Sequence, residues 1–265
     1  MNHAEIRSAA NPRFRLLLEL ASSSRARREK GVALIEGDHL GLAWIESGAR
    51  KAEEVILPRR SLSRPGIGAL CEKLAHALLV LDDGLFDRLS QVEHGPGPLI
   101  LIPVVAHSLP PAVNTDAVYC DGIQDPGNVG TILRSAAAFG VKIVIASAQT
   151  ADVWSPKVLR AAMGAHFQLQ MIEDIPVDAL IAAAGQVRIS AADPRGGVRL
   201  DTADLRSPRI WVFGSEGRGL SAAFDSVPAL ERLRIPQSQA VESLNVATAA
   251  AVCLYEQYRQ RLGSP

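Results

Sequence analysis

The segment DPGNVGTILRSAAAFG, residues 125–140, joins a turn with two glycines to a regular helical pattern. The apolar stretch AVYCDGI, residues 117–123, comes directly before it and is typical of a buried strand. A strand, a glycine turn and a helix in this order usually hold a nucleotide or phosphate at the helix start. Here, however, neither the G-x-G-x-x-G spacing of dinucleotide-binding folds nor a Gly-Lys-Ser/Thr loop is present. Neither nucleotide motif explains the turn, so we ask what other chemistry it serves.

Two polar side chains in this segment are candidates for that chemistry. Asn128 is predicted to cap a helix that begins at Val129, with Gly127 relieving the turn. Arg134 lies beside the apolar stripe of the helix and can reach over the turn towards a ligand. The alternative for this segment alone is a helix cap followed by a solvated arginine.

Two further segments have the same character. WVFGSEGRGLS, residues 211–221, is an apolar strand that leads into three glycines around Glu216, where the backbone can approach a ligand closely. RIPQSQAVESLNVATAAAVCLYE, residues 234–256, closes a strand and opens a helix expected from about Glu242 to Arg261. For Ser243 a role as helix cap is the alternative to a functional role, and Asn245 is expected to have a dedicated hydrogen-bond partner. The alternative for the glycine loop is a flexible turn with a solvated Glu-Arg pair.

The remaining chain alternates between strand and helix patterns, which predicts an α/β protein. Asn11 and Pro12 mark the start of a first helix, and apolar stretches without strict alternation predict a parallel sheet beyond residue 116. The expected stripe of the last helix is Leu244, Ala247, Ala251, Leu254 and Tyr258. The proline-containing HSLPPAVNTD favours a linker. We expect a small α/β domain over residues 1–107, a linker over 108–116 and a second α/β domain over 117–265.

The composition limits the possible functions. The 265 residues carry a formal net charge of zero, so charge alone gives no argument for nucleic-acid binding. The three cysteines, Cys71, Cys120 and Cys253, are far apart and are expected to be small core residues in a reducing compartment. The histidines are scattered, with His94 and His166 expected to be structural, so no metal site is predicted. We find no signal segment or membrane span and expect a cytoplasmic protein.

The three polar segments, in this order, resemble the three motifs of the SpoU family of RNA ribose 2′-O-methyltransferases, in the SPOUT superfamily. The stretch NPRFRLLLELASSSRARREKGVALIEGDHL, residues 11–40, resembles the substrate-binding domain that many members carry. The resemblance implies a parallel sheet with a deep trefoil knot, a homodimer formed through the C-terminal domain, and S-adenosylmethionine as methyl donor. It places the donor against Gly214, Ser215, Glu216, Gly217, Ile235, Pro236, Leu244 and Asn245. It assigns catalysis to Asn128, Arg134, Glu216, Ser243 and Asn245.

In the family, the arginine that Arg134 matches is proposed to be the general base, but arginine almost never loses its proton in a protein. A phosphate clamp or a stabiliser of the developing alkoxide is physically easier, with Glu216 or water taking the proton. Ala162 and Ala247 stand where the family often has serine, which puts any role of those hydroxyls in doubt.

A separate N-terminal domain favours large-subunit (23S) ribosomal RNA as substrate over transfer RNA, which stays an alternative. Further alternatives are a non-catalytic RNA-binding assembly factor and a base methyltransferase that uses a cysteine nucleophile. Metal-dependent hydrolysis finds no support in the sequence. The candidate RNA contacts, each with a solvated helix face as its alternative, are Arg13, Arg25, Arg27, Arg28, Lys30, Lys157 and Arg160.

Overall fold

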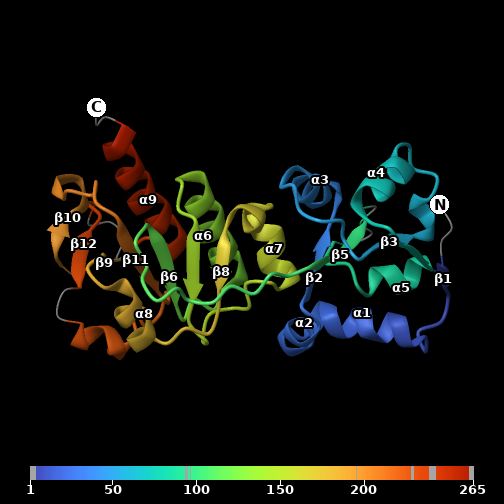
Figure 1. Ribbon diagram of the computed structural model, residues 1–265, viewed down its shortest axis with the longest axis horizontal. Coiled ribbons are helices and arrows are strands. Elements are labelled where there is room, and N and C mark those ends of the chain that lie inside the picture. The colour runs from blue at the N-terminus through green and yellow to red at the C-terminus, as the bar shows by residue number, and fades with distance from the viewer. Residues whose placement is uncertain are drawn as a thin grey trace. The chain divides into compact units, whose positions relative to one another are not determined.

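The computed structural model describes residues 4–92, 95, 97–194, 196–227, 230–238 and 243–262. Its contacts divide the chain into two compact units, Met1–Ala106 with Trp154–Phe167, and His107–Val153 with Gln168–Pro265 (Figure 1). The expected division was wrong in one respect, because it assigned Trp154–Phe167 to the C-terminal domain. A linker over residues 108–116 stays a prediction.

The first unit is a five-stranded sheet in the order β1-β4-β3-β5-β2, in which β5 runs antiparallel to both of its neighbours. One face packs on α1, α2 and α5 through Phe14 and Phe86, and the other packs on α3, α4 and α7 through Trp44 and Leu159. Asn11 caps α1 through the backbone N–H of Arg13, as predicted. The elements are β1 (Ala4–Ile6), α1 (Pro12–Ser22), α2 (Ser24–Lys30), β2 (Val32–Glu36), α3 (Asp38–Glu46), β3 (Glu54–Pro58), α4 (Ile67–Leu74), β4 (Leu78–Leu81), α5 (Asp83–Asp87), β5 (Leu99–Pro103) and α7 (Pro156–Ala162).

The second unit is a seven-stranded sheet in the order β10-β12-β9-β11-β6-β7-β8, and every pairing in it is parallel. The predicted buried parallel sheet is therefore confirmed. The helices and strands of this unit are β6 (Ala117–Asp121), α6 (Pro126–Ala138), β7 (Ile143–Ala146), β8 (Gln170–Ile172), α8 (Val177–Ala184), β9 (Arg188–Ala192), β10 (Val198–Arg199), β11 (Arg209–Gly214), β12 (Glu231–Arg234) and α9 (Val246–Leu262).

Helices cover both faces of this sheet, and α6 packs directly against α9 (Figure 1). Ile210 and Val212 of β11 share one apolar cluster with Leu180 of α8. Trp211 points to the opposite face, where its Nε1 donates to Gln257 of α9 at 2.7 Å. Alternate residues of β11 are thus buried against different helices, which explains why this strand lacks an exposed polar face.

The buried face of α9 differs from the expected one. The residues it buries are Ala247, Ala250, Cys253, Leu254 and Gln257. The predicted Ala251 is only partly buried and Tyr258 is exposed. Gln257 is buried because its amide bridges the Trp211 indole and Asp116, to which its Nε2 donates at 2.9 Å. These contacts of Gln257 with residues distant in the sequence explain why the buried face of α9 includes a polar side chain and differs from the purely apolar stripe.

A buried ion pair joins the amino ends of β11 and β12. Arg209 is fully buried and donates to Glu231 at 2.7 Å, to the Ser190 hydroxyl at 3.0 Å and to the Asp204 carbonyl at 2.8 Å. Burial lowers the pKa of Arg209, and the Glu231 carboxylate opposes that effect. The pair is part of the scaffold, because it lies at the end of the strands opposite to the three polar motifs.

Glu231→Gln is expected to lower the free energy of unfolding by about 2–3 kcal/mol, because the buried Arg209 charge loses its counter-ion. Denaturant unfolding followed by circular dichroism measures this. The matched control is Asp201→Asn, since the Arg199–Asp201 pair is half-exposed on both sides and its loss is expected to leave stability unchanged. Equal stability of both variants would contradict the structural role of the buried pair.

Candidate functional site

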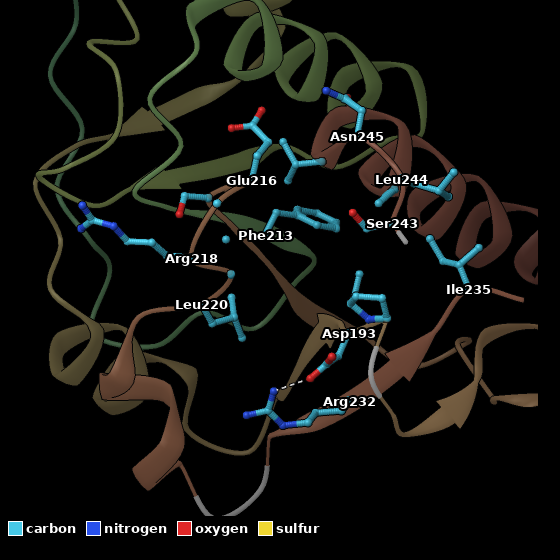
Figure 2. A pocket seen from close by; sticks show the side chains of 18 of the residues that line it. Asp193, Phe213, Glu216, Arg218, Leu220, Arg232, Ile235, Ser243, Leu244 and Asn245 are labelled. Atoms are coloured by element: carbon cyan, nitrogen blue, oxygen red, sulfur yellow. Dashed lines mark hydrogen bonds and ion pairs between the residues drawn. The ribbon is translucent and has the colours of Figure 1, made fainter. Parts of the chain in front are cut away.

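A cavity of about 470 Å³ lies at the carboxyl ends of β9, β11 and β12 (Figure 2). Open parallel sheets bind their ligands at this edge, and cofactor sites typically have volumes of about 300–1,000 Å³. The wall combines apolar side chains, such as Phe213, Leu220 and Leu244, with polar groups from the second and third motifs. The residues that line it are 192–194, 213–220, 232, 235, 237, 243–246 and 249.

The glycine loop of the second motif is closed by its own backbone. Ser215 N–H donates to the Gly219 carbonyl at 3.0 Å, and Gly219 N–H donates back to the Ser215 carbonyl at 2.8 Å. Gly219 has a φ of +70°, which favours glycine. A Cβ at Gly214 would lie 2.3 Å from the Gly219 carbonyl oxygen. The loop can fold over the end of β11 only with glycine at position 214.

Asp125, and not Asn128, caps helix α6. The Asp125 carboxylate accepts from the backbone N–H of Asn128 at 2.8 Å, and Pro126 occupies the first helical turn. The prediction of a helix capped by Asn128 was therefore wrong by three residues. The side chain of Asn128 is left to point away from its own helix and to make contacts elsewhere.

Asn245, and not Ser243, caps helix α9. Its Oδ1 accepts from the backbone N–H groups of Ala247 at 2.9 Å and Thr248 at 3.2 Å. The helix begins at Val246, later than expected, and the predicted start at Glu242 lies outside the described residues. Ser243 is exposed and lines the cavity.

The first, second and third motifs meet in a chain of side-chain hydrogen bonds. Asn245 Nδ2 donates to Asn128 Oδ1 at 3.0 Å, and Asn128 Nδ2 donates to Glu216 Oε1. Helix α9 fixes the direction of this chain, because its N–H groups require the Asn245 oxygen and so turn the amide nitrogen towards Asn128. The same order turns the Asn128 nitrogen towards the Glu216 carboxylate. The expectation that Asn245 has a dedicated partner is confirmed.

Arg134 lies apart from this chain. It is exposed on α6, six residues beyond Asn128, so the two side chains leave the helix in different directions. Within the described part of the molecule its guanidinium makes no side-chain hydrogen bond or ion pair, and it does not line the cavity. The structure thus brings together Asn128, Glu216 and Asn245, with Ser243 nearby on the cavity wall, but leaves Arg134 pointing into solvent.

Most of the predicted donor-binding residues line the cavity; Pro236 is the exception. The motifs did not identify Ala192, the last residue of β9, Asp193 and Pro194, which follow that strand, or Arg232 of β12. In the sequence, the largely apolar stretch QVRISAAD, residues 186–193, runs up to these residues, so the rule that ligands bind beyond the carboxyl ends of strands was the available signal. Asp193 accepts from Arg232 at 2.7 Å inside the cavity wall (Figure 2).

The candidate RNA contacts of the first unit have different surroundings. Arg27 is buried and donates to the Leu20 carbonyl at 2.6 Å, so its assignment to an RNA surface was wrong. Arg13 pairs with Glu54 and Arg25 with Glu29. The remaining candidates are exposed, namely Arg28, Lys30, Lys157 and Arg160. Arg160 also donates to the Gln91 carbonyl at 3.1 Å.

The cysteines are buried, as predicted. Burial raises the pKa of Cys120 to about 12 and also raises those of Cys71 and Cys253. Protonated, buried thiols are poor nucleophiles, which argues against the base-methylation alternative. Of the histidines expected to be structural, His166 is buried beside Trp154, whereas His94 lies outside the described residues.

Three other observations concern the sequence-based expectations. In the part of the chain that the structure describes, no cluster of three or more His, Cys, Asp and Glu side chains is suited to a metal ion. Over the same residues, no helix is long and apolar enough to cross a membrane. Ala162 and Ala247 are both buried, so each packs as a small apolar side chain where the family often has serine.

The fold and site together define an α/β protein with a parallel sheet, whose cavity is lined by the second and third motifs and is joined to the first motif through Asn128. A sequence profile described as the SpoU rRNA Methylase family matches residues 116–255, more than half of the chain. The chain therefore belongs to the SpoU family.

Individual relatives agree with this family. An uncharacterized tRNA/rRNA methyltransferase of Synechocystis sp. is 34% identical over 97% of this chain and 94% of its own length. The Bacillus subtilis 23S rRNA (guanosine(2553)-2′-O)-methyltransferase RlmP is 28% identical over 95% of this chain and 98% of its own. Among solved structures, the SpoU methyltransferase AviRb from Streptomyces viridochromogenes, in complex with AdoMet, superposes with a TM-score of 0.85 at 25% identity. That superposition covers 96% of this chain and all of AviRb.

Proposed function

We propose that this chain transfers a methyl group from S-adenosylmethionine to the 2′-hydroxyl of a ribose in RNA, and that its substrate is large-subunit ribosomal RNA. The observation that carries the proposal is the row of hydrogen bonds from Asn245 through Asn128 to Glu216, which joins the first motif to the two motifs that line the cavity. The solved relative AviRb is in complex with AdoMet, and the relative RlmP is a 23S rRNA 2′-O-methyltransferase. Transfer RNA remains the second candidate, since the Synechocystis relative is described as a tRNA/rRNA methyltransferase.

The cavity fits S-adenosylmethionine in size and in chemistry. Apolar side chains such as Phe213, Leu220 and Leu244 suit the adenine ring, while backbone and polar groups of the 215–219 loop suit the amino-acid part. Gly214 lets the loop backbone fold closely over the end of β11 at the cavity surface, and Gly219 allows the positive φ that the loop needs. When bound, the cofactor supplies a methyl group already activated by its sulfonium.

The protein's own residues are then needed to align the ribose hydroxyl with the methyl group and to stabilise the charge that develops when the hydroxyl loses its proton. A ribose hydroxyl that attacks an activated methyl group must be aligned with it and must lose a proton. Glu216, held by the Asn128 amide, provides a carboxylate oxygen that can accept that proton directly or through water. Asn128 is itself held by Asn245, so the position of the carboxylate depends on the start of α9. Arg134 stabilises the developing alkoxide or holds a neighbouring RNA phosphate.

The solvent-exposed position of Arg134 supports a site that two copies of the chain complete. Helices α6 and α9 lie side by side, and their outer surface carries Phe139, Tyr255 and Tyr258. The ring centroid of Phe139 lies 5.7 Å from that of Tyr255 and 5.9 Å from that of Tyr258. Tyr255 is 51% exposed and Leu262 68% exposed. Exposed apolar groups of this kind mark association surfaces. We place the homodimer interface on this surface, with Arg134 of each copy serving the cavity of the other.

This arrangement predicts complementation between inactive variants. Arg134→Ala and Glu216→Ala homodimers are each expected to be inactive, and a mixture of the two is expected to recover part of the activity. One site of each mixed dimer would carry both intact residues, so the mixture should reach about a quarter of native activity if subunits exchange freely. Methyl transfer after co-refolding measures this. A mixture that stays as inactive as either variant would contradict a shared site.

Asn245→Asp separates the capping role of Asn245 from its place in the hydrogen-bond chain. The carboxylate still accepts from the α9 N–H groups, so the free energy of unfolding is expected to change by less than about 0.5 kcal/mol. The donor towards Asn128 is lost, and methyl transfer is expected to fall at least about tenfold. Asn245→Ala is the comparison, with an additional stability cost of about 1 kcal/mol. Full activity of Asn245→Asp would contradict a catalytic role for the hydrogen bonds that join Asn245, Asn128 and Glu216.

The finer parts of the resemblance belong to the same proposal. These are a deep trefoil knot in the C-terminal sheet, a cytoplasmic location, and RNA contacts by Arg13, Arg25, Arg28, Lys30, Lys157 and Arg160. The likeness to AviRb over 96% of this chain supports the knot. The exposure of all of these basic side chains except Arg13, which is partly buried, supports the contacts.

The substrate is tested with labelled S-adenosylmethionine and purified RNA from cells that lack this enzyme. Incorporation into 23S rRNA, with little into 16S rRNA or transfer RNA, is the expected result. Incorporation into transfer RNA alone would overturn the ribosomal assignment while keeping the reaction. Lack of incorporation into any RNA, together with no calorimetric binding of the donor, would favour the non-catalytic RNA-binding alternative.

A further inference from the structure

We propose that Asp193, held in place by Arg232, accepts hydrogen bonds from the ribose hydroxyls of the cofactor. The inference rests on the proposed function and adds a recognition element that lies outside the three motifs. Asp193 directly follows β9, and its backbone N–H donates to the Leu233 carbonyl of β12 at 2.9 Å. Its side chain is only 9% exposed and forms part of the cavity wall. In Figure 2, Asp193 and Arg232 lie on the side of the cavity opposite to Glu216 and Asn245.

The charges of this pair select the part of the cofactor that suits it. Arg232 Nη1 lies 2.7 Å from Asp193 Oδ2. The Asp193–Arg232 pair is neutral as a whole, so it offers no net attraction to either charged group of the cofactor's amino-acid part. The ribose hydroxyls are neutral donors, and a carboxylate with about four lone-pair sites can accept from them while it accepts from Arg232. Dinucleotide-binding folds use an acidic residue beyond a strand for the same ribose contact.

A purely structural role explains the pair less well. Strands β9 and β12 are already joined in register, with Ala191 opposite Arg232 and Ala192 opposite Leu233. A partly exposed ion pair adds little stability to strands that are paired in this way. The Arg232 side chain is 34% exposed, and it also lies 3.7 Å from Asp225. Of these two carboxylates, only that of Asp193 belongs to the cavity wall.

Calorimetric titration with three ligands tests the inference. The ligands are S-adenosylhomocysteine, 5′-methylthioadenosine, which lacks the amino-acid part, and a 2′,3′-dideoxyribose analogue of S-adenosylhomocysteine. Asp193→Ala is expected to weaken the first two equally, by about tenfold or more, and to leave the already weak affinity for the dideoxy analogue unchanged. The matched control is Asp225→Ala, which removes the other carboxylate near Arg232 from a site that is 77% exposed and should bind all three ligands as the native chain does.

Three other results of these titrations would contradict or redirect the assignment of Asp193. Unchanged affinity of Asp193→Ala for S-adenosylhomocysteine would overturn the inference. A loss for S-adenosylhomocysteine and its dideoxy analogue, with unchanged affinity for 5′-methylthioadenosine, would overturn it too and would assign Asp193 to the amino-acid part instead. Should Asp193→Ala fail to fold, Asp193→Asn retains an acceptor and is expected to discriminate less between the ribose and dideoxyribose ligands. If the native chain binds none of these ligands, the proposed function fails first, which distinguishes that failure from the failure of this inference.

Discussion

Arg134→Ala is expected to lower the rate of methyl transfer by about 10³-fold, while the Kd for S-adenosylmethionine stays within about twofold of the native value. Preorganised cationic groups at a developing oxyanion contribute rate factors of this size. Cofactor affinity should be retained because Arg134 does not line the cavity and, among the described residues, makes no side-chain hydrogen bond or ion pair. Single-turnover transfer and calorimetric binding of the donor measure the two quantities separately.

Arg134→Lys is the matched variant, since it keeps the charge but loses the planar fork that binds phosphate at two points. We expect it to lie between the native chain and Arg134→Ala. An Arg134→Ala variant with nearly native turnover, or with donor affinity reduced as much as turnover, would contradict the assigned role.

Gly214→Ala is expected to reduce the affinity for S-adenosylmethionine by at least about 100-fold. The added Cβ would lie 2.3 Å from the Gly219 carbonyl oxygen, 2.4 Å from its carbon and 2.6 Å from the Leu220 nitrogen. All three atoms are backbone, so no side-chain rotation relieves the clash, and the closed loop at 215–219 has to open. Calorimetric titration of the donor measures the loss.

Gly196→Ala provides the control for this substitution. A Cβ at Gly196 meets no atom within 4 Å, and the residue does not line the cavity. The variant is expected to bind the donor as the native chain does. Native affinity in Gly214→Ala would show that the loop tolerates a side chain there and would contradict the close packing as a requirement for binding.

The sequence predicted the parts of the fold that depend on local patterns. The buried strands of the parallel sheet are recognisable because each is a short apolar stretch without alternation. The three motifs were placed correctly at strand ends because Gly214 and the glycines after Glu216 mark the loop beyond β11. The cap at Asn11 is also local, since a good capping residue precedes proline.

Other features depend on contacts between distant residues and were therefore missed. Asn128 and Asp125 are equally good capping residues in isolation, and the position of Pro126 decides between them. Gln257 is buried because Trp211 and Asp116 bind its amide. The Asp193–Arg232 pair joins residues 39 positions apart, and no motif marks either of them.

The most direct test of the account is the chemical identity of the product. RNA methylated by the purified enzyme with labelled S-adenosylmethionine is digested completely to nucleosides and separated by chromatography with mass detection. We expect the label in a 2′-O-methylnucleoside, at one position resistant to alkaline cleavage, and its loss with Arg134→Ala. A label in a base-methylated nucleoside, or a label that persists in full with Arg134→Ala, would contradict it.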